Sequence, residues 1–354
     1  PFGKVGNRAD AARRIAAIRS AGSTNLAGGW MLGLHELRRS PEGMGRRILL
    51  LSDGLLNVGI VDPKQVAGLA ARGLERDGAR TSCLGFGDHY NEDLMGEMAR
   101  VTGGAFHDAT SPESFPDIFR KELESLQNIS AQNVRVRVRK LHYCTGVLVM
   151  ADYPLTPLRD GGLEIAVGDL VSLEERALVF GLEVLPLPEA AGLNLEGEAL
   201  ADIEVAWDEI TDAEIRSRVE RITLRVKAVQ DPAQVVVKDA VLSWVALQQA
   251  GQTLREAIPD MDGGRFGSVR ERVLKALDGL KRYGRPESVA EGVALLEEFL
   301  ARMEHWDVSQ RKHASARYHR ASKPSSYYRV SELPQRPPAA KPAPGETPTG
   351  SGKG

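Results

Sequence analysis

The pattern of apolar and polar positions alternates between two periods over residues 1–128. Short apolar runs predict strands at residues 47–52, 80–86 and 105–107. Segments of helical period predict helices at residues 11–20, 25–39, 62–77, 91–103 and 111–127. Strands that alternate with helices of this length are typical of an α/β fold with a doubly wound parallel sheet. We therefore expect a parallel sheet covered by helices over residues 1–130.

The apolar period changes to two at residue 133. Val134, Val136 and Val138 alternate with arginines, which indicates a strand with one face buried. Further strand-like runs, separated by Gly and Pro, lie at residues 146–150, 162–167, 177–185, 199–207 and 221–229. Short strands in this arrangement favour an antiparallel β-sandwich. We assign residues 131–232 to this second domain.

The period returns to that of a helix after residue 233. Helices are predicted at residues 234–258, 266–283 and 286–306, with breaks at glycines and a proline between them. This pattern favours a small α-helical segment, a hairpin or bundle, over residues 233–308.

Residues 309–354 begin as a basic, tyrosine-bearing stretch and become rich in Pro and Gly. We expect the basic stretch at residues 311–329 to be an extended solvated linker and the remainder to be a disordered tail. Two alternatives stay open for the basic stretch. It could contact nucleic acid or an acidic partner, or it could fold back onto the acidic region at residues 141–233.

Composition narrows the functional classes. A formal net charge of −2 over 354 residues argues against a general nucleic-acid binder. No run of 18 apolar residues is present, so no membrane segment is visible. The two cysteines, Cys83 and Cys144, are too few for a disulfide framework and lie in apolar runs. These features favour a reducing compartment, and we expect a cytoplasmic location.

Two short motifs carry the candidate chemistry. Thr24 lies in the loop sequence AGSTN at residues 21–25, and Asp53 lies in LSDG at residues 51–54, where a strand ends. Ligands bind beyond the carboxyl ends of the strands in doubly wound sheets. A hydroxyl and a carboxylate suit Mg²⁺, although two ligands are too few for a complete shell. The plainer alternative is a helix cap at Thr24 and an ordinary turn at Asp53.

In these motifs the chain resembles the von Willebrand factor type A (vWA) domain. The family's metal-ion-dependent adhesion site (MIDAS) combines an Asp-x-Ser-x-Ser loop, a loop threonine matched by Thr24, and a strand-end aspartate matched by Asp53. The sequences at residues 84–87 and 102–104 extend the resemblance to about residue 128. No Asp-x-Ser-x-Ser sequence occurs in the chain. We therefore interpret it as an N-terminally truncated vWA protein of the bacterial multi-domain type.

The resemblance implies a non-enzymatic protein-interaction module. Its metal ligands would be Thr24 and Asp53, and its cofactor Mg²⁺, or Mn²⁺ or Ca²⁺, held weakly or not at all by this fragment. A protein partner would supply an acidic side chain to the open coordination position, with no nucleic acid expected. One alternative is a metal-dependent hydrolase that uses Asp53 with His89 and His107, which also follow predicted strands. The other is a structural scaffold with a vestigial metal site.

Overall fold

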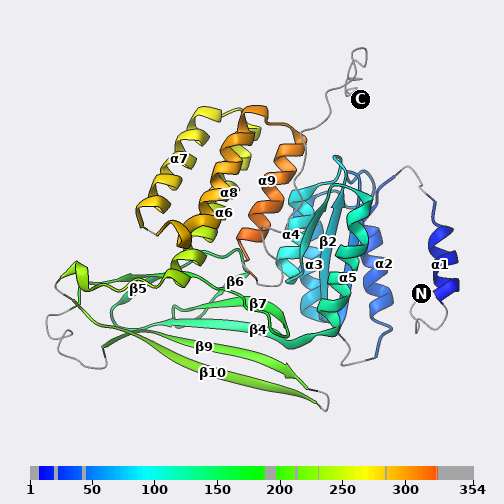
Figure 1. The fold of residues 1–354 in the computed structure, drawn as a ribbon. Coiled ribbons are helices and arrows are strands. Elements are labelled where there is room, and N and C mark those ends of the chain that lie inside the picture. Colours follow the sequence, from blue (N-terminus) through cyan, green and yellow to red (C-terminus); the bar gives the residue numbers. More distant parts are fainter. Residues whose placement is uncertain are drawn as a thin grey trace.

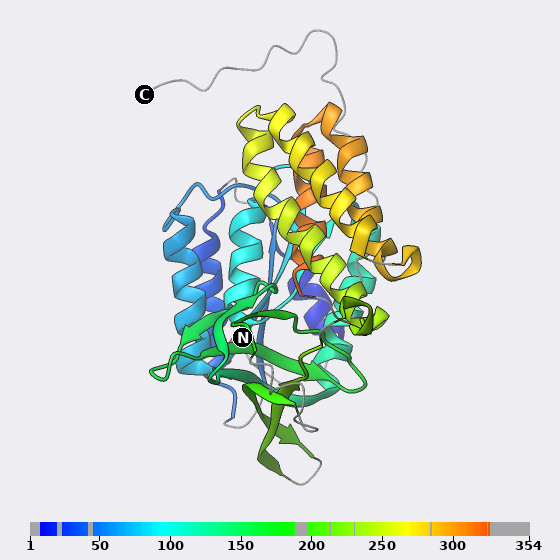
Figure 2. The same cartoon turned by 90° about the vertical axis from the view of Figure 1, so that its left-hand side faces the viewer.

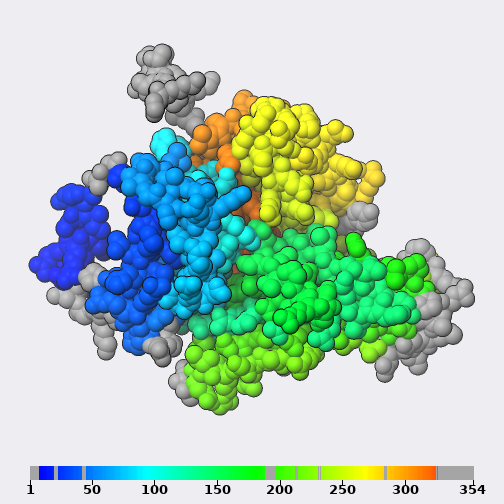
Figure 3. Space-filling model, turned by 180° about the vertical axis from the view of Figure 1, so that it is seen from behind, coloured from blue at the N-terminus to red at the C-terminus, as the bar shows by residue number. Residues whose placement is uncertain are grey.

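The computed structural model describes residues 8–19, 23–41, 45–187, 197–211, 214–229, 231–283, 285–323 and 325. Three units pack together in it (Figure 1). An α/β unit lies beside a helical bundle, and an antiparallel sheet lies along one end of both. The view from behind shows the same three units in mutual contact (Figure 3).

The α/β unit contains a parallel sheet with the strand order β1-β2-β3. Its elements in chain order are α1 (Arg8–Ala16), α2 (Leu26–Leu37), β1 (Arg46–Ser52), α3 (Pro63–Asp77), β2 (Ala79–Phe86), α4 (Glu92–Thr102), β3 (Phe106–Ala109), the 3-10 turn η1 (Pro112–Ser114) and α5 (Phe115–Gln127). Helices α2, α3 and α4 share one hydrophobic core with β1 and β2. The parallel sheet and its helices agree with the sequence prediction.

Local signals explain the helix boundaries in this unit. Asp62 caps α3 by accepting hydrogen bonds from the backbone of Lys64 and Gln65, and Gly78 ends the helix in the left-handed conformation at φ 64°. Asn91 caps α4 in the same way, and Gly103 ends it at φ 70°. These caps fix where each helix begins and ends, and therefore where the loops at the sheet edges lie.

The second unit holds a five-stranded antiparallel sheet with the order β10-β9-β4-β7-β6 and a separate β5-β8 pair. Its strands are β4 (Ile129–Lys140), β5 (Cys144–Val149), β6 (Leu155–Pro157), β7 (Leu163–Val171), β8 (Phe180–Val184), β9 (Glu198–Ile210) and β10 (Ile215–Val226). Val136 and Ile165 of the large sheet share a core cluster with Val147 and Phe180 of the pair. The β9–β10 hairpin extends away from the bundle (Figure 2).

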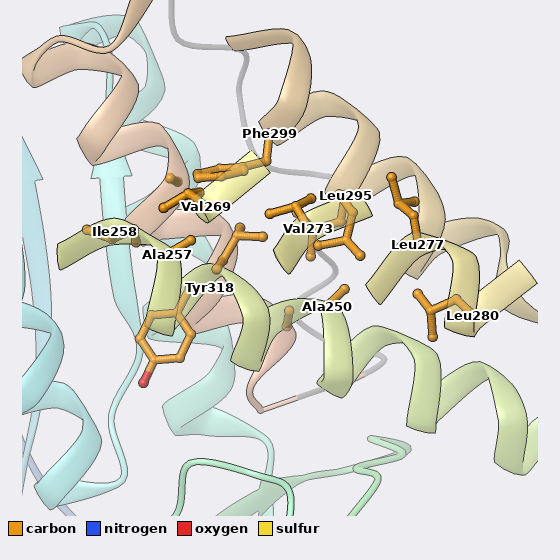
Figure 4. Packing of buried hydrophobic residues seen from close by; sticks show 14 of the residues in the cluster. Ala250, Ala257, Ile258, Val269, Val273, Leu277, Leu280, Leu295, Phe299 and Tyr318 are labelled. Carbon is orange, nitrogen blue, oxygen red and sulfur yellow. The ribbon is translucent and has the colours of Figure 1, made fainter. Parts of the chain in front are cut away.

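Four helices form the bundle in the described part of the chain. They are α6 (Asp239–Asp262), α7 (Phe266–Tyr283), α8 (Pro286–Arg302) and α9 (Val308–Ala321), with 3-10 turns η3 (Pro232–Gln234) and η4 (Met303–His305). Apolar side chains of α6, α7 and α8, such as Ala250, Leu277 and Phe299, fill the centre (Figure 4). Tyr318 of α9 belongs to the same cluster.

Helix α9 corrects the prediction for the basic stretch. An extended solvated linker is wrong for Val308–Ala321, because this segment is a helix and most of its side chains are buried. Arg311, Lys312 and Arg317 are paired with acids of other elements, so the burial of this helix does not require an apolar face. The alternative of folding back is supported in part, since Tyr318 donates a hydrogen bond to Asp152 and Ser325 pairs with Arg176 in an isolated bridge. The expected tail from residue 326 onward lies outside the described residues.

Both cysteines, Cys83 and Cys144, are buried free thiols. Burial raises the pKa of Cys83, as is usual for a thiol packed in a core. Within the described ranges, no helix combines the length and the apolar character that a bilayer crossing needs.

Candidate functional site

The structure brings the two sequence motifs together at the carboxyl end of β1. Thr24 precedes α2, and Asp53 follows the last residue of β1. A Cβ atom placed on Gly54 would lie 3.4 Å from Thr24 Oγ1, so the threonine hydroxyl lies against the residue that follows Asp53. The Asp53 side chain is exposed and Thr24 is half-buried. The hydroxyl and the carboxylate therefore belong to one edge of the sheet.

Hydrogen bonds join the loop that contains Thr24 to the loop that follows β1. The Thr24 backbone N–H donates to Asn57 Oδ1 at 2.7 Å, and the Asn57 backbone N–H donates to the Thr24 carbonyl oxygen at 3.2 Å. Asn25 accepts from the Gly28 backbone and is the N-cap of α2. Gly59, at φ 79°, lies so close to Asn25 that a Cβ there would be 2.6 Å from its Oδ1. The helix cap is thus Asn25, and the interpretation of Thr24 as the cap is wrong.

The edge offers oxygen donors suited to a hard cation, but few of them. Thr24 supplies a hydroxyl and Asp53 a carboxylate, while Ser52 Oγ donates to the Gly54 carbonyl oxygen at 3.0 Å. Mg²⁺ is commonly held by one or two carboxylates with several waters, so these donors fit the ion's chemistry. No group of three or more His, Cys, Asp or Glu side chains placed to hold a metal occurs among the described residues. A cation here would depend on water and on outside ligands. Ala21 and Gly22 of the loop motif lie outside the described residues.

The two histidine-containing motifs have different surroundings. Asp88 and His89 follow β2 and are exposed. His107 and Asp108 lie inside β3, where they are 4% and 6% exposed, and do not follow the strand as predicted. The sequence interpretation ended β3 too early, at residue 107. His107 is therefore a core side chain and not part of an open edge.

His107 belongs to a buried charge cluster that the sequence interpretation missed. Its Nε2 lies 2.8 Å from Glu122 Oε1 on α5, and its Nδ1 lies 3.2 Å from an Arg320 nitrogen. Burial, and then the Arg320 charge, lower the pKa of His107 although Glu122 opposes this. Burial alone would raise the pKa of Glu122, but its bond to His107 and the Arg47 charge outweigh burial and lower it to about 2. A neutral His107 beside an ionised Glu122 joins β3 to α5 and α9.

Exposed apolar side chains lie close to Asp53 in sequence and on the neighbouring helix α2. Leu55 is 59% exposed and Val58 is 43% exposed in the loop after β1. Leu51 on β1 is 45% exposed, and Leu32 on α2 is 69% exposed. Exposed apolar groups that gather beside polar ones mark surfaces suited to protein contacts.

Comparisons with known proteins agree with this architecture. No family model matches the chain. An uncharacterized protein of Synechocystis sp. is 24% identical over 260 residues, which are 70% of this chain and 59% of that protein. The chain therefore spans little more than half the length of this curated relative.

Two solved structures share the fold. A von Willebrand factor type A protein from Catenulispora acidiphila matches with a TM-score of 0.60 and 12% identity, over 83% of this chain and 65% of that one. The human COPII-coat protein Sec24c matches with a TM-score of 0.52 and 12% identity, over 89% of this chain and 44% of that one.

Proposed function

Because the chain has the fold of von Willebrand factor type A domain proteins, we propose that it is a non-enzymatic protein-interaction module. Its contact surface is the carboxyl edge of the parallel sheet around Thr24 and Asp53. The observation that carries this proposal is the packing of the Thr24 hydroxyl against Gly54, 3.4 Å from a Cβ position there. This packing supports a single polar surface that is built from two motifs 29 residues apart in sequence.

A divalent cation would be held by the Thr24 hydroxyl and the Asp53 carboxylate. When bound, Mg²⁺, or Mn²⁺ or Ca²⁺, supplies positive charge and open coordination positions. An acidic side chain of a partner protein is the matching ligand. Because no group of three or more metal-ligating side chains is gathered in the described ranges, we expect the cation alone to bind weakly.

The surroundings of the edge favour a protein partner over a small substrate. Leu55 and Val58 flank Asp53 and are 59% and 43% exposed. A partner that covers these side chains removes apolar surface from water while its carboxylate reaches the cation. The partner therefore has an acidic residue surrounded by apolar ones.

The hydrolase alternative has less support from the geometry. His107 hydrogen bonds to Glu122 at 2.8 Å inside the protein, so it is not presented at an open edge beside Asp53. His89 is exposed in the loop after β2, and no set of three metal-ligating side chains is gathered in the described ranges. A scaffold with a vestigial metal site is the remaining alternative, and the metal titration below distinguishes it.

The test is a titration of the full chain with Mn²⁺, in which the electron paramagnetic resonance signal of the free ion measures how much is bound. We expect wild type to bind Mn²⁺ weakly, and both Asp53→Asn and Thr24→Val to weaken binding by about tenfold or more, since each removes an oxygen donor. Asp117→Asn on α5, whose side chain is 77% exposed, is the matched control and should bind as wild type does. Equal binding by all four proteins, or none by wild type, would refute the cation site.

A second measurement tests the partner chemistry. Peptides with one Asp or Glu between leucines are compared with Asn or Gln versions, with Mg²⁺ or with EDTA. We expect binding only for acidic peptides with Mg²⁺, and loss of binding in Leu55→Ser. Binding that ignores both EDTA and Asp53→Asn would move the interaction surface elsewhere.

A further inference from the structure

A pocket lies where the three units meet, away from the cation site. It is formed by the end of α4, the start of β3, strand β7 and the segment that follows α9. Its empty space is about 830 Å³, including the part open to solvent. It lies near the amino ends of β1 and β3, whereas Thr24 and Asp53 lie at the carboxyl end of β1. The pocket is thus a separate place on the molecule.

The pocket lining has an excess of positive charge. Five of its side chains are cationic, namely Arg47, Arg100, Arg176, Arg320 and Lys323. Asp169 is the acid that lines it, and Asp169 already accepts from Arg80 Nε at 2.5 Å. Arg47, Arg100 and Arg176 each have a carboxylate within ion-pair distance. The lining still brings several cations to one place, and an anion that enters would add to their carboxylate partners.

Arg47 Nε and the Tyr153 hydroxyl are buried polar atoms of this lining for which the described residues provide no hydrogen bond of good geometry, although the Arg176 side chain lies close to the hydroxyl. Tyr153 is only 4% exposed. Burial raises the pKa of Tyr153, and the nearby Arg176 offsets this only in part, so the hydroxyl keeps its proton and can donate. Buried donors without partners are uncommon and are unfavourable for folding. An acceptor oxygen in the pocket would satisfy both.

Lys323 adds a third group that fits an anion. Its Nζ lies 3.4 Å from the Arg100 carbonyl oxygen, and in the described part of the chain no carboxylate is within ion-pair distance of it. Burial, with Arg100 and Arg176 adding to it against Asp152, lowers the pKa of Lys323 to about 7. A bound anion would favour the charged form of Lys323.

The remaining wall is apolar. Phe106, Val167 and Val171, with Ala105 and Ile129, line the pocket beside the cations. A bare inorganic anion would leave this wall without a partner, whereas an organic anion would cover it.

We propose that this pocket binds a small organic anion, a carboxylate or phosphate group joined to an apolar body. Lys323, Arg47 and the Tyr153 hydroxyl hold its oxygens, and the apolar body packs on Phe106, Val167 and Val171. Residues of all three units line the pocket, so the ligand contacts all three at once. Because the pocket exists only in the folded chain, ligand binding stabilises the folded state.

The experiment is thermal unfolding and calorimetric titration of the full chain with sodium benzoate, phenyl phosphate and inorganic phosphate. Sodium chloride at equal ionic strength is the salt control. We expect benzoate or phenyl phosphate to raise Tm by about 2–4 °C near saturation, and chloride to leave it unchanged. The better of the two organic probes identifies the head group. An equal effect of inorganic phosphate would overturn the assignment of an apolar body, and no shift with any probe would overturn the pocket.

Variants separate a specific site from general stabilisation by salt. Tyr153→Phe keeps the ring and removes only the hydroxyl, and Lys323→Met keeps most of the side-chain volume. Each should weaken binding of the organic probe by about tenfold, since each removes a charge-assisted hydrogen bond. Lys281→Met, at an exposed ion pair on α7, is the matched control and should bind as wild type does. Unchanged affinity in both pocket variants would overturn the proposal while leaving the cation site untouched.

Discussion

Lys312 Nζ lies 3.6 Å from the centre of the Tyr90 ring and donates a hydrogen bond of 2.5 Å to the Tyr90 carbonyl oxygen. The same nitrogen is 2.5 Å from Glu92 Oε2, and the Lys312 side chain is only 1% exposed. Its neighbour Arg311 contacts Glu92 and lies 2.6 Å from Asp93. Two consecutive cations of α9 therefore bind the start of α4, more than 200 residues earlier in the chain.

We expect Lys312→Met to destabilise the protein by about 3 kcal/mol or more, because it leaves the buried Glu92 charge without its main partner. The measurement is the free energy of unfolding from urea titration. Lys281→Met, whose ion pair with Glu297 is exposed, should change this free energy by less than about 1 kcal/mol. The double variant Lys312→Met with Glu92→Gln should be more stable than Lys312→Met alone. If it is less stable, the ion pair is not the reason for the loss.

Gly96 tests how closely α9 packs on α4. A Cβ atom at Gly96 would lie 2.1 Å from His319 Nε2, so Gly96→Ala forces the histidine ring away from α4. We expect a loss of about 1–3 kcal/mol in the free energy of unfolding. Gly279→Ala in α7 is the control, because a Cβ there meets nothing within 4 Å and alanine favours a helix. That change should stabilise slightly, and equal effects at both sites would contradict close packing at Gly96.

We expect acid to lower the free energy of unfolding through protonation of His319. Burial, with Lys323 adding to it against Asp152 and Glu97, lowers the pKa of His319 from 6.5 to about 4. The unfolded chain therefore binds this proton more tightly than the folded chain does. Stability from His319 is complete above pH 6.5 and is lost as the pH falls from 6.5 towards 4.

The change from this one group is about 3 kcal/mol, since one unit of pKa corresponds to about 1.4 kcal/mol. The check is the free energy of unfolding at several pH values for wild type and for His319→Gln. The variant should show a shallower loss between pH 6.5 and 4, although other groups, such as the buried His107, still titrate. Parallel curves for the two proteins would show that His319 does not titrate as expected.

The α/β unit was largely predictable because its signals are local. Asp62 and Gly78 mark the ends of α3 by themselves, since a cap acts within a few residues of its helix. Thr24 and Asp53 could be placed at one edge because parallel strands all end on the same side. The sequence did not show where β3 ends. His107 was therefore predicted to lie at the open edge of the sheet, although it is buried inside the strand.

Helix α9 escaped prediction for a physical reason. A pattern of apolar positions reveals a helix whose buried face is apolar, but Lys312 and Arg317 are buried by pairing with Glu92 and Glu298. Those partners lie on other helices, so the pattern of residues within α9 cannot predict the pairing. The pocket that we propose binds an anion was hidden in the same way, because Tyr153 and Lys323 come from different units.

Asn57 gives a test of how the loop positions the candidate cation site. Its Oδ1 accepts from the Thr24 backbone N–H at 2.7 Å, and the residue is exposed. Asn57→Ala should therefore free the loop while the global free energy of unfolding changes by about 1 kcal/mol or less. We expect faster hydrogen exchange at the Thr24 amide, and Mn²⁺ affinity lowered severalfold because the hydroxyl is held less firmly against Gly54. Asn128→Ala, which removes a 2.9 Å bond to the Glu124 carbonyl at the end of α5, is the control and should change neither. Faster exchange with unchanged Mn²⁺ affinity would mean that Thr24 is not a ligand, whereas unchanged exchange would mean that Asn57 does not hold the loop.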